Sequence, residues 1–413
     1  MEVRLNCHTD CEIVHKKLKN GAELYIIPKN RKTKVAVVSF RVGAADTQFS
    51  FKETKYTVPS GTAHFLEHRM FELKEECVID RFSELGAYVN AYTDGSKTVY
   101  IFKATELFEE SFRLLLDFVN KPYFVAEEIN NEKKIIASEI NMYGDDPFWQ
   151  SYFGALKKLF PDSPISDEIA GSVKSIDQIT PDILYLCHKA FYTPQNMTIV
   201  CGGGVNADEV IKIAEEMAVN GEEKAKKCRQ HVKAVGGVSK IKMDISVPVY
   251  CIAFPARVDG GRIKNGFIYK ILGDMLFGES SAAFKQIIKE DLSEDRPIVQ
   301  YSSDGGVGIF AVTGTSTKCE RTAEIIKKTL HDFAFKGEID SKEFSACVRR
   351  VTGEIIRSLD DAEAAVNAQA EWSSENITAP EVITMVRNLT EREVFWAAKE
   401  IGKIYGLGIV SKE

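Results

Sequence analysis

The sequence predicts an α+β protein with two similar domains, each a mixed or antiparallel sheet packed against helices. The first observation is length, because 413 residues exceed what one hydrophobic core usually supports. The second is composition, since 44% apolar and 27% charged residues are typical of a globular protein and not of a disordered or membrane-embedded one. The third is an internal repeat. Together they predict two domains of roughly 200 residues each.

The repeat is carried by residues in the helical part of each half. Asp117 precedes Glu139 by 22 residues, and a large apolar residue follows each of them. Asp332 precedes Glu354 by the same 22 residues, again with an apolar residue after each. An equal offset in the two halves favours a duplicated structural unit. We therefore expect a similar helix pair in each domain.

Local patterns predict the elements of the first half in order. Asn20-Gly21, between two apolar runs, predicts a hairpin. In chain order we expect strands at 22–28 and 35–42, a short helix around His64, strands within 86–104, a helix at 105–119, a long acidic helix from residue 126, and a strand that ends in glycines near residue 202. Gly202-Gly203-Gly204 resembles a phosphate-binding loop, but the Lys-Ser/Thr of a P-loop is absent. The glycines therefore predict a strand-to-helix turn.

The domain boundaries follow from a charged stretch, "VNGEEKAKKCRQHV", whose composition is typical of a linker. We expect an N-terminal domain at 1–218, a linker at 219–236 and a homologous C-terminal domain at 237–413.

Charge and cysteine usage indicate the setting. The net charge of −7 gives no reason to expect a nucleic-acid partner. Nine cysteines are scattered without a C-x-x-C pair, which favours reduced thiols in a cytoplasm over a disulfide framework. The opening "MEVRLNCHTD" has no apolar signal-peptide core, and no later run is long enough to span a bilayer. We expect a cytoplasmic protein that does not contact a membrane.

One group of candidate zinc ligands lies near the N-terminus, where Cys7, His8, Cys11 and His15 crowd together. This segment runs directly into the predicted hairpin, so we expect it to lie largely on the first strand. Successive side chains of a strand point to opposite faces of the sheet. We therefore expect no metal site there.

A stronger candidate is "GTAHFLEHRMFE", in which two histidines and a glutamate fall within five positions. On a helix with about 100° per residue, His64, Glu67 and His68 share one face. Two imidazoles at i and i+4 can bind one zinc ion, which then needs a third protein ligand and an open position for water. Glu67 is placed to take a proton from that water. The order matches the inverted H-x-x-E-H signature of zinc peptidases; a surface helix whose histidines bond to carboxylates is the alternative.

A third ligand is available downstream, in "NNEKKIIASEI". Glu132 and Glu139 are seven residues apart, almost two helical turns, so both carboxylates share one face of the predicted helix. We expect Ile135, Ile136 and Ile140 on the apolar side of that helix. A carboxylate-bearing helix that faces the histidine-bearing helix supplies the His₂Glu set of a catalytic zinc site. In isolation the two glutamates would be solvated helix charges.

At these blocks the sequence resembles the pitrilysin/insulinase family of inverted zinc metallopeptidases, which includes the mitochondrial processing peptidases. "GTAHFLEHRMF" is similar to the family's His-Phe-Leu-Glu-His block, "NAYTDGSKTVY" to its Asn-Ala-x-Thr strand, and "EKKIIASEI" to the segment that bears the third ligand. The resemblance covers both halves and is closest to small bacterial members that equal half of a full-length pitrilysin. It implies that the two domains form half of a clamshell chamber.

The resemblance also implies roles for individual residues. His64, His68 and Glu139 would bind one zinc ion per chain. Glu67 would be the general base, and Glu132 would assist as a second carboxylate beside the site. The N-terminal domain would then be catalytic, and the C-terminal domain would lack the zinc motif.

The implied function is a zinc-dependent endopeptidase that cleaves peptides or short unfolded polypeptides. Asn90 and Ala91 would lie on an exposed strand edge that pairs with the substrate backbone, so that specificity is loose. Two alternatives stay open. The chain could be a non-catalytic peptide-binding or assembly subunit, although the intact motif argues against this, or it could be a protease dedicated to removing the leader segment of one peptide.

The second half departs from the family in one respect. Active relatives supply an Arg and, seven residues later, a Tyr that reach the substrate carbonyl. Here Lys289 takes the Arg position and Arg296 the Tyr position, while Tyr301 lies further along. Lysine lacks the planar fork of arginine, and Lys289 and Tyr301 fill these roles only after a loop adjustment. We therefore expect a heterodimer in which a sister subunit supplies the Arg and Tyr, with a homodimer as the alternative.

Overall fold

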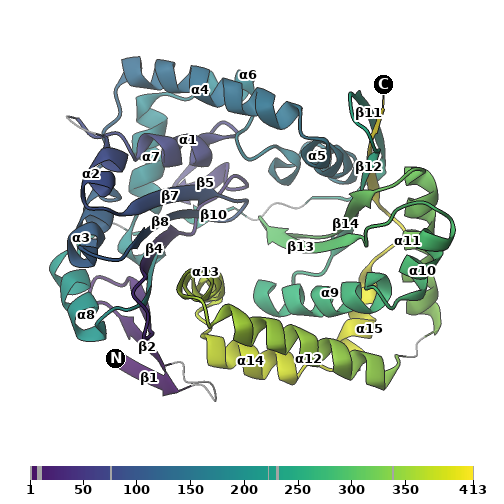
Figure 1. Cartoon of the computed structure of the whole chain (residues 1–413). Helices are drawn as coiled ribbons and strands as arrows, with labels where there is room; N and C mark the ends of the chain where they lie inside the picture. The colour runs from purple at the N-terminus through teal and green to yellow at the C-terminus, as the bar shows by residue number, and fades with distance from the viewer. Residues whose placement is uncertain are drawn as a thin grey trace. The chain divides into compact units, whose positions relative to one another are not determined.

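The computed structural model describes all residues except 1, 7–11, 75–76, 222, 229–231, 337–338 and 413. The chain forms two compact units, each assembled from three separate segments. The first unit contains Met1–Ser138, Glu168–Cys228 and Glu354–Ile383, and the second contains Glu139–Asp167, Arg229–Gly353 and Thr384–Glu413. Segments far apart in the sequence therefore meet within one unit (Figure 1).

The first unit is built on a seven-stranded sheet with the order β1-β2-β3-β9-β4-β8-β7. Its central strand β4 is apolar and buried on both faces, since Val35, Ala36, Val37 and Val38 have no exposed surface. The strands are β1 (Glu2–Asn6), β2 (Glu12–Lys17), β3 (Glu23–Pro28), β4 (Lys34–Phe40), β7 (Tyr88–Thr93), β8 (Thr98–Ala104) and β9 (Met197–Gly203). A smaller sheet, in the order β10-β5-β6, contains β5 (Gln48–Phe51), β6 (Thr54–Thr57) and β10 (Lys226–Lys227).

The second unit is built on a five-stranded sheet with the order β11-β15-β12-β14-β13. Its strands are β11 (Gly237–Met243), β12 (Val249–Ala256), β13 (Ile298–Asp304), β14 (Val307–Thr315) and β15 (Gly406–Lys412).

Helices flank the strands in both units. The α-helices are α1 (Thr62–Arg69), α2 (Val78–Glu84), α3 (Phe108–Phe118), α4 (Ala126–Gly144), α5 (Pro147–Leu159), α6 (Val173–Ile176), α7 (Pro181–Phe191), α8 (Ala207–Glu216), α9 (Arg262–Phe277), α10 (Ala282–Lys289), α11 (Cys319–Lys336), α12 (Ser341–Ser358), α13 (Ala362–Trp372), α14 (Ala379–Arg387) and α15 (Glu391–Glu400). In the described part of the chain, three short 3₁₀ turns lie at Pro164–Ser166, Pro194–Asn196 and Ser373–Glu375.

The two sheets share one topology over five strands. In the first unit β3, β4, β7, β8 and β9 follow one another in the chain and lie in the order β3-β9-β4-β8-β7. The strands β11 to β15 have the same permutation in the second unit. In each sheet the first pair is parallel, β3 with β9 and β11 with β15, and the other pairs are antiparallel. The prediction of two similar α+β domains is therefore confirmed.

Each sheet is covered by a helix from the opposite half of the sequence. Helix α5 packs on β11, β12 and β15 of the second unit, and α13 packs on β9 and β4 of the first. Glycines allow the close approach, because a Cβ on Gly408 of β15 would lie 1.9 Å from the carbonyl oxygen of Ser151 in α5. A Cβ on Gly202 of β9 would lie 2.6 Å from a methyl carbon of Val366 in α13. These strand glycines thus serve helix packing.

Several predicted elements are confirmed. Strands β2 and β3 pair antiparallel around the turn at Asn20-Gly21, where Gly21 has a φ of +97°. The long acidic helix from residue 126 is α4. Strand β9 ends at Gly203, and α8 begins at Ala207, so the glycines form a strand-to-helix turn as expected.

Other predictions need correction. The helix predicted at 105–119 begins only at Phe108, because Leu107 has a left-handed conformation. Ile135 is 57% exposed, whereas Glu132 shares the buried face of α4 with Ile136. Ile136 is buried as predicted, but the prediction for Ile135 was wrong, and the charged Glu132 joins the buried face because polar partners described below contact it.

The N-terminal segment and the predicted linker are described only in part. Cys7, His8 and Cys11 lie outside the described residues, and His15 lies on β2, where Glu23 accepts a 2.8 Å hydrogen bond from its ring. Within the predicted linker, Lys226–Lys227 forms β10, which pairs with β5. This part of the segment is attached to the first unit.

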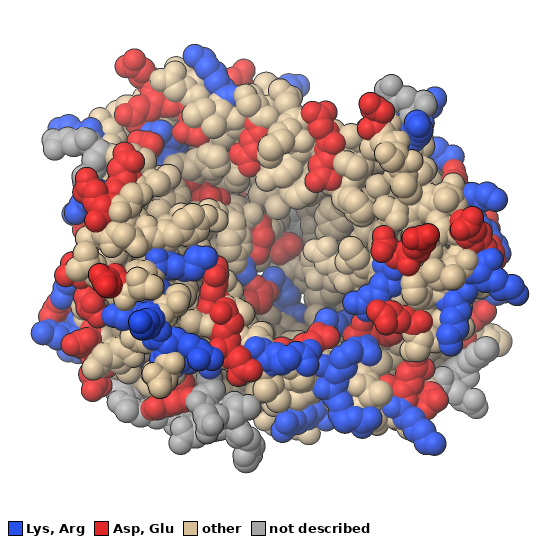
Figure 2. All heavy atoms as spheres, viewed as in Figure 1, with Lys and Arg blue, Asp and Glu red and all other residues tan. Residues whose placement is uncertain are grey.

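Figure 2 shows acidic and basic side chains intermingled over the visible face of the molecule. Within the described residues, no helix has both the length and the apolar character needed to cross a membrane.

Candidate metal centre

Helix α1 carries the histidine motif and is fixed at its start by a glycine. Gly61, the residue before the helix, has a φ of +88°, and a Cβ there would lie 2.3 Å from the carbonyl oxygen of Ala170. Phe65 and Leu66 anchor the helix in the core. Their burial turns His64, Glu67 and His68 toward the other elements that form the site.

The three predicted ligands come together. The donor atoms of His64, His68 and Glu139 all lie within 4.8 Å of one another, and the two imidazole rings are 4.5 Å apart. The boundary between the two units falls next to Glu139, but α4 is one continuous helix that also carries Glu132. Across the described residues, this is the one group of three such side chains with donor atoms this close. Two imidazoles and one carboxylate fit a zinc ion.

Glu67 lies beside this group and is held by strand β7. Its side chain is buried, and Thr93, the last residue of β7, donates a 2.7 Å hydrogen bond to Glu67 Oε2. Thr93 is the threonine of the Asn-Ala-x-Thr block, and the sequence predicted no role for it. The signal was present, because a threonine at the end of a strand can donate to a neighbouring carboxylate.

Glu132 contacts one ring nitrogen of His68. His68 Nδ1 donates to Glu132 Oε1 at 3.0 Å, which leaves Nε2 as the nitrogen available to a metal. Burial alone would raise the pKa of Glu132, but the hydrogen bond and charge of His68, together with Arg69, lower it below its ordinary value. Glu132 therefore remains a carboxylate that orients the ring.

Arg69 and Glu128 complete this network and were missed in the sequence. Arg69 is 3% exposed, with Nη1 at 3.5 Å from Glu132 Oε2 and Nη2 in contact with Glu128 Oε2. The sequence signal was the i, i+4 spacing of Glu128 and Glu132, which places both carboxylates on one helix face.

Asn90 and Ala91 lie on β7, the last strand of the seven-stranded sheet. The Ala91 N–H donates to the Asn90 side-chain oxygen at 2.9 Å, so this N–H points away from β8. Residues alternate in direction along a strand, so the backbone of Val89 also points toward this outer edge.

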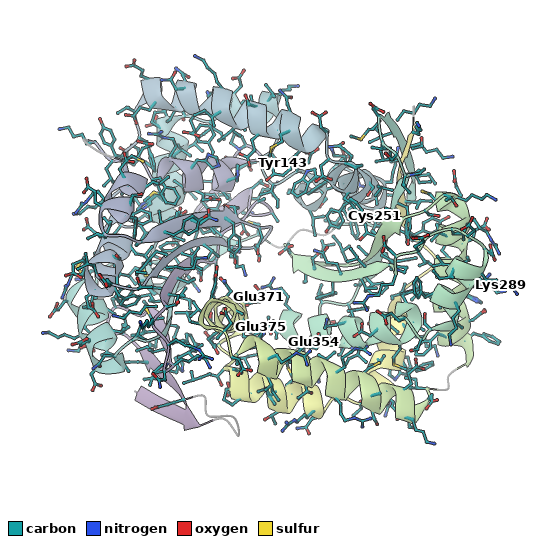
Figure 3. All side chains as sticks on the ribbon, in the orientation of Figure 1. Tyr143, Cys251, Lys289, Glu354, Glu371 and Glu375 are labelled. Atoms are coloured by element: carbon teal, nitrogen blue, oxygen red, sulfur yellow. The ribbon has the colours of Figure 1, made fainter. Side chains whose placement is uncertain are left out.

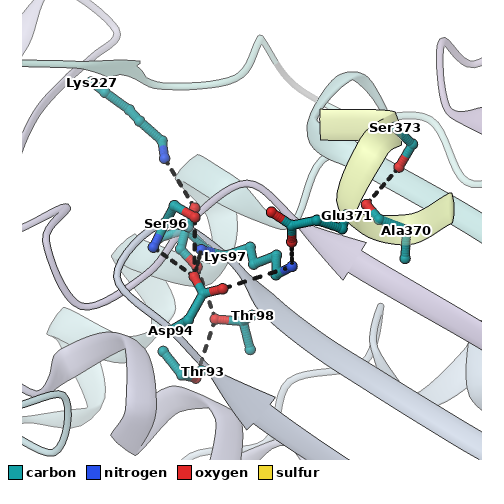
Figure 4. Close-up of polar contacts among 10 residues, drawn as sticks. Thr93, Asp94, Ser96, Lys97, Thr98, Lys227, Ala370, Glu371 and Ser373 are labelled. Carbon is teal, nitrogen blue, oxygen red and sulfur yellow. Dashed lines mark hydrogen bonds and ion pairs between the residues drawn. The ribbon is translucent and has the colours of Figure 1, made fainter. Parts of the chain in front are cut away.

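The turn between β7 and β8 is anchored by a polar network (Figure 4). Asp94 Oδ1 accepts hydrogen bonds from the backbone N–H groups of Ser96 and Lys97, at 2.7 and 2.8 Å. Lys97 also pairs with Glu371 of α13. Burial would lower the pKa of Lys97, but the carboxylates of Glu371 and Asp94 raise it above its ordinary value. The network fixes the end of β7, and with it Thr93.

The residues predicted to contact substrate from the second half lie in the second unit. Lys289 ends α10 and is exposed, at the outer edge of that helix in Figure 3. Arg296 is also exposed. Tyr301 lies on β13, where its hydroxyl donates to the Arg257 carbonyl at 2.9 Å and its ring stacks on Tyr269 at 5.0 Å.

Helix α9 of the second unit is the counterpart of α1. It follows Gly261, which has a φ of +98°, as α1 follows Gly61. Counted from these glycines, Lys264 takes the position of His64, Phe267 that of Glu67 and Ile268 that of His68. Lys264 forms a 2.5 Å ion pair with Glu393. The second copy therefore has the helix without the ligands.

Known proteins resemble the chain in sequence. A family model described as insulinase (peptidase family M16) matches residues 30–159, and one described as the peptidase M16 inactive domain matches 178–351. The uncharacterized zinc protease YmfH of Bacillus subtilis is 29% identical over 396 residues, which cover 92% of each chain. The mitochondrial-processing peptidase subunit beta of Caenorhabditis elegans is 30% identical over 166 residues, 38% of this chain and 35% of that one.

Solved structures resemble it in fold. The crystal structure of an M16-like peptidase from Alicyclobacillus acidocaldarius has a TM-score of 0.92 at 27% identity and covers 100% of both chains. A protease from Helicobacter pylori has a TM-score of 0.82 at 18% identity, over 97% of this chain and 99% of that one. The second likeness supports the fold alone.

Proposed function

Because the chain belongs to the M16 (insulinase) family of peptidases, we propose that it is a zinc-dependent endopeptidase for peptides or short unfolded polypeptides. The observation that carries the proposal is the donor group of His64, His68 and Glu139, whose ligand atoms lie within 4.8 Å of one another. Three protein ligands leave a position for water, as catalytic zinc sites require. Relatives named as zinc proteases support the choice of metal.

The side chains around this group have separate tasks. A zinc ion bound there would polarise the scissile carbonyl and lower the pKa of water. Glu67 takes the proton of the attacking water and returns it to the leaving amine. Thr93 restrains the Glu67 carboxylate through its 2.7 Å hydrogen bond, so that the base is held in one orientation. Glu132 keeps the His68 ring oriented through Nδ1.

The substrate binds as an extra strand along the outer edge of β7. The backbone groups of Val89 and Ala91 face this edge, and the Asn90 side chain that now accepts from the Ala91 N–H gives way to a substrate carbonyl. Backbone pairing reads the main chain more than the side chains, which makes the preference for sequence loose. Asn90 and Ala91 are therefore substrate-binding residues in this proposal.

The chain works with a sister subunit that supplies an arginine and a tyrosine. Lys289 provides a charge without the arginine fork, and the Tyr301 hydroxyl donates to a carbonyl of its own unit. The relative named as the beta subunit of a processing peptidase supports a paired arrangement. A homodimer is the second candidate, because its other copy brings Lys289 and Tyr301 with it.

Elemental analysis and a peptide-cleavage assay test this proposal together. We expect one zinc per chain, weak cleavage by the isolated chain, and a large increase when the sister subunit is added. Full activity of the single chain would contradict the heterodimer and leave the endopeptidase intact. Absence of both zinc and cleavage, with or without a partner, would favour a non-catalytic peptide-binding subunit.

A further inference from the structure

We propose that Arg69 and Glu128 are positioning residues that join α1 to α4 and hold Glu132 against His68. The inference rests on the proposed metal centre, because the two joined helices carry its ligands. His64 and His68 lie on α1, and Glu139 lies on α4. A fixed spacing between α1 and α4 sets the distance between the two imidazoles and the Glu139 carboxylate, which must all reach one ion.

The contacts make Arg69 a connection between two carboxylates on one helix. Its side chain is 4% exposed and reaches Glu132 Oε2 at 3.5 Å through Nη1, and Glu128 Oε2 through Nη2. Glu128 and Glu132 are one helical turn apart, so a single planar guanidinium contacts both. A lysine ammonium at this position is a compact point charge and cannot match two separate carboxylates equally well.

The burial of the network explains why its members depend on one another. Glu132 has a side chain only 10% exposed, and it uses Oε1 for His68 and Oε2 for Arg69. A buried carboxylate or guanidinium is costly unless it is paired. Loss of Arg69 therefore leaves Glu132 without the group that fixes its second oxygen, and Glu132 then moves away from His68.

Glu128 is the member that tests this idea most cleanly. Its side chain is 37% exposed, so its replacement by glutamine changes the charge without opening the core. Its role is to hold the outer end of the Arg69 guanidinium. Without that contact the Arg69 side chain rotates toward solvent, and its ion pair with Glu132 weakens.

The consequence is a change in metal affinity. Partners of metal-bound histidines typically contribute 10- to 100-fold to metal affinity. We expect Arg69→Met to weaken zinc binding by about tenfold or more, and Glu128→Gln by about threefold, because Glu128 acts one contact further away. Arg69→Lys should lie between Arg69→Met and the wild type.

The test measures the zinc dissociation constant of the purified full-length chain by competition with a chromogenic chelator. Arg113→Met is the control for loss of an Arg–Glu pair, because it removes an exposed pair of the same unit, Arg113 of α3 with Glu216 of α8 at 2.6 Å. The variants Arg69→Met, Arg69→Lys and Glu128→Gln are compared with it, together with the double variant Arg69→Met/Glu128→Gln. Thermal unfolding of the zinc-free proteins records any general loss of stability.

A positioning role predicts that the two single effects do not add, so the double variant binds zinc as weakly as Arg69→Met. Additive effects, or a wild-type dissociation constant in Arg69→Met, would overturn the proposal. If Arg69→Met does not fold, Glu128→Gln decides: unchanged zinc affinity rejects the idea. A wild-type chain that binds no zinc would reject the proposed metal centre itself. A wild-type chain that binds zinc, with variants of equal affinity, would reject only the positioning role of Arg69 and Glu128.

Discussion

The hydrogen bond from Thr93 to Glu67 gives the sharpest prediction about the catalytic base. Thr93→Val keeps the shape of the side chain and removes the hydroxyl that donates to the buried Glu67 carboxylate at 2.7 Å. A hydrogen bond to a charged group contributes about 1.5–3 kcal/mol. If this restraint is fully used in the transition state, kcat falls by roughly 10- to 100-fold, since 1.36 kcal/mol corresponds to a factor of ten. Zinc content should not change, because the Thr93 hydroxyl bonds to Glu67, which is not one of the proposed ligands.

The assay is steady-state cleavage of a quenched fluorescent peptide, with zinc measured on the same samples. Thr93→Ser is the control, because it retains a hydroxyl and should keep most of the activity. The reasoning would be refuted by a Thr93→Val enzyme with wild-type kcat, or by equal losses in the serine and valine variants.

Three further predictions concern packing, pH and the ligand set. Gly408→Ala should lower the free energy of unfolding by about 2 kcal/mol or more, measured in urea, because the new Cβ would lie 1.9 Å from the Ser151 carbonyl oxygen. Burial lowers the pKa of His188 from 6.5 to about 4, so the folded state binds a proton less readily than the unfolded chain. Stability should therefore fall between pH 6.5 and 4, by roughly 3 kcal/mol, and His188→Gln should reduce this slope in unfolding titrations. Glu139→Ala should abolish zinc binding, whereas Glu132→Ala should still take up zinc at saturating concentration, with an affinity lowered at least as much as in Arg69→Met, and lose activity; equal metal contents in the two variants would contradict the assignment of these two residues.

The sequence predicted the fold well where local signals and spacing determine it. The turn at Asn20-Gly21 and the strand ending at Gly203 correspond to elements of the structure, and the equal offsets correspond to two helix pairs, α3 with α4 and α11 with α12. The packing of α5 on the sheet of the second unit, and of α13 on the sheet of the first, was not predictable from the sequence. It depends on tertiary contacts between segments that are far apart in the chain. The glycines that permit it, such as Gly408, looked like ordinary strand or turn residues.

The site was predictable to the extent that it rests on helical spacing. The spacing of His64 and His68, and that of Glu132 and Glu139, identified the helix faces that the structure brings together. The partners that restrain them were not predictable, because Thr93 comes from a strand and its contact depends on tertiary packing. Hydrophobicity alone predicts that Ile135 is buried and Glu132 is exposed, whereas Ile135 is 57% exposed and Glu132 is buried against polar partners.

The central claim is that Glu67 handles protons beside a zinc ion that other residues bind. Glu67→Gln tests it most directly, because glutamine keeps the size of the side chain and cannot accept the proton. The measurement is zinc content and peptide cleavage on the same purified protein, with its sister subunit present. We predict one zinc per chain, as in the wild type, and no detectable hydrolysis. Loss of zinc in Glu67→Gln, or cleavage at the wild-type rate, would contradict this account.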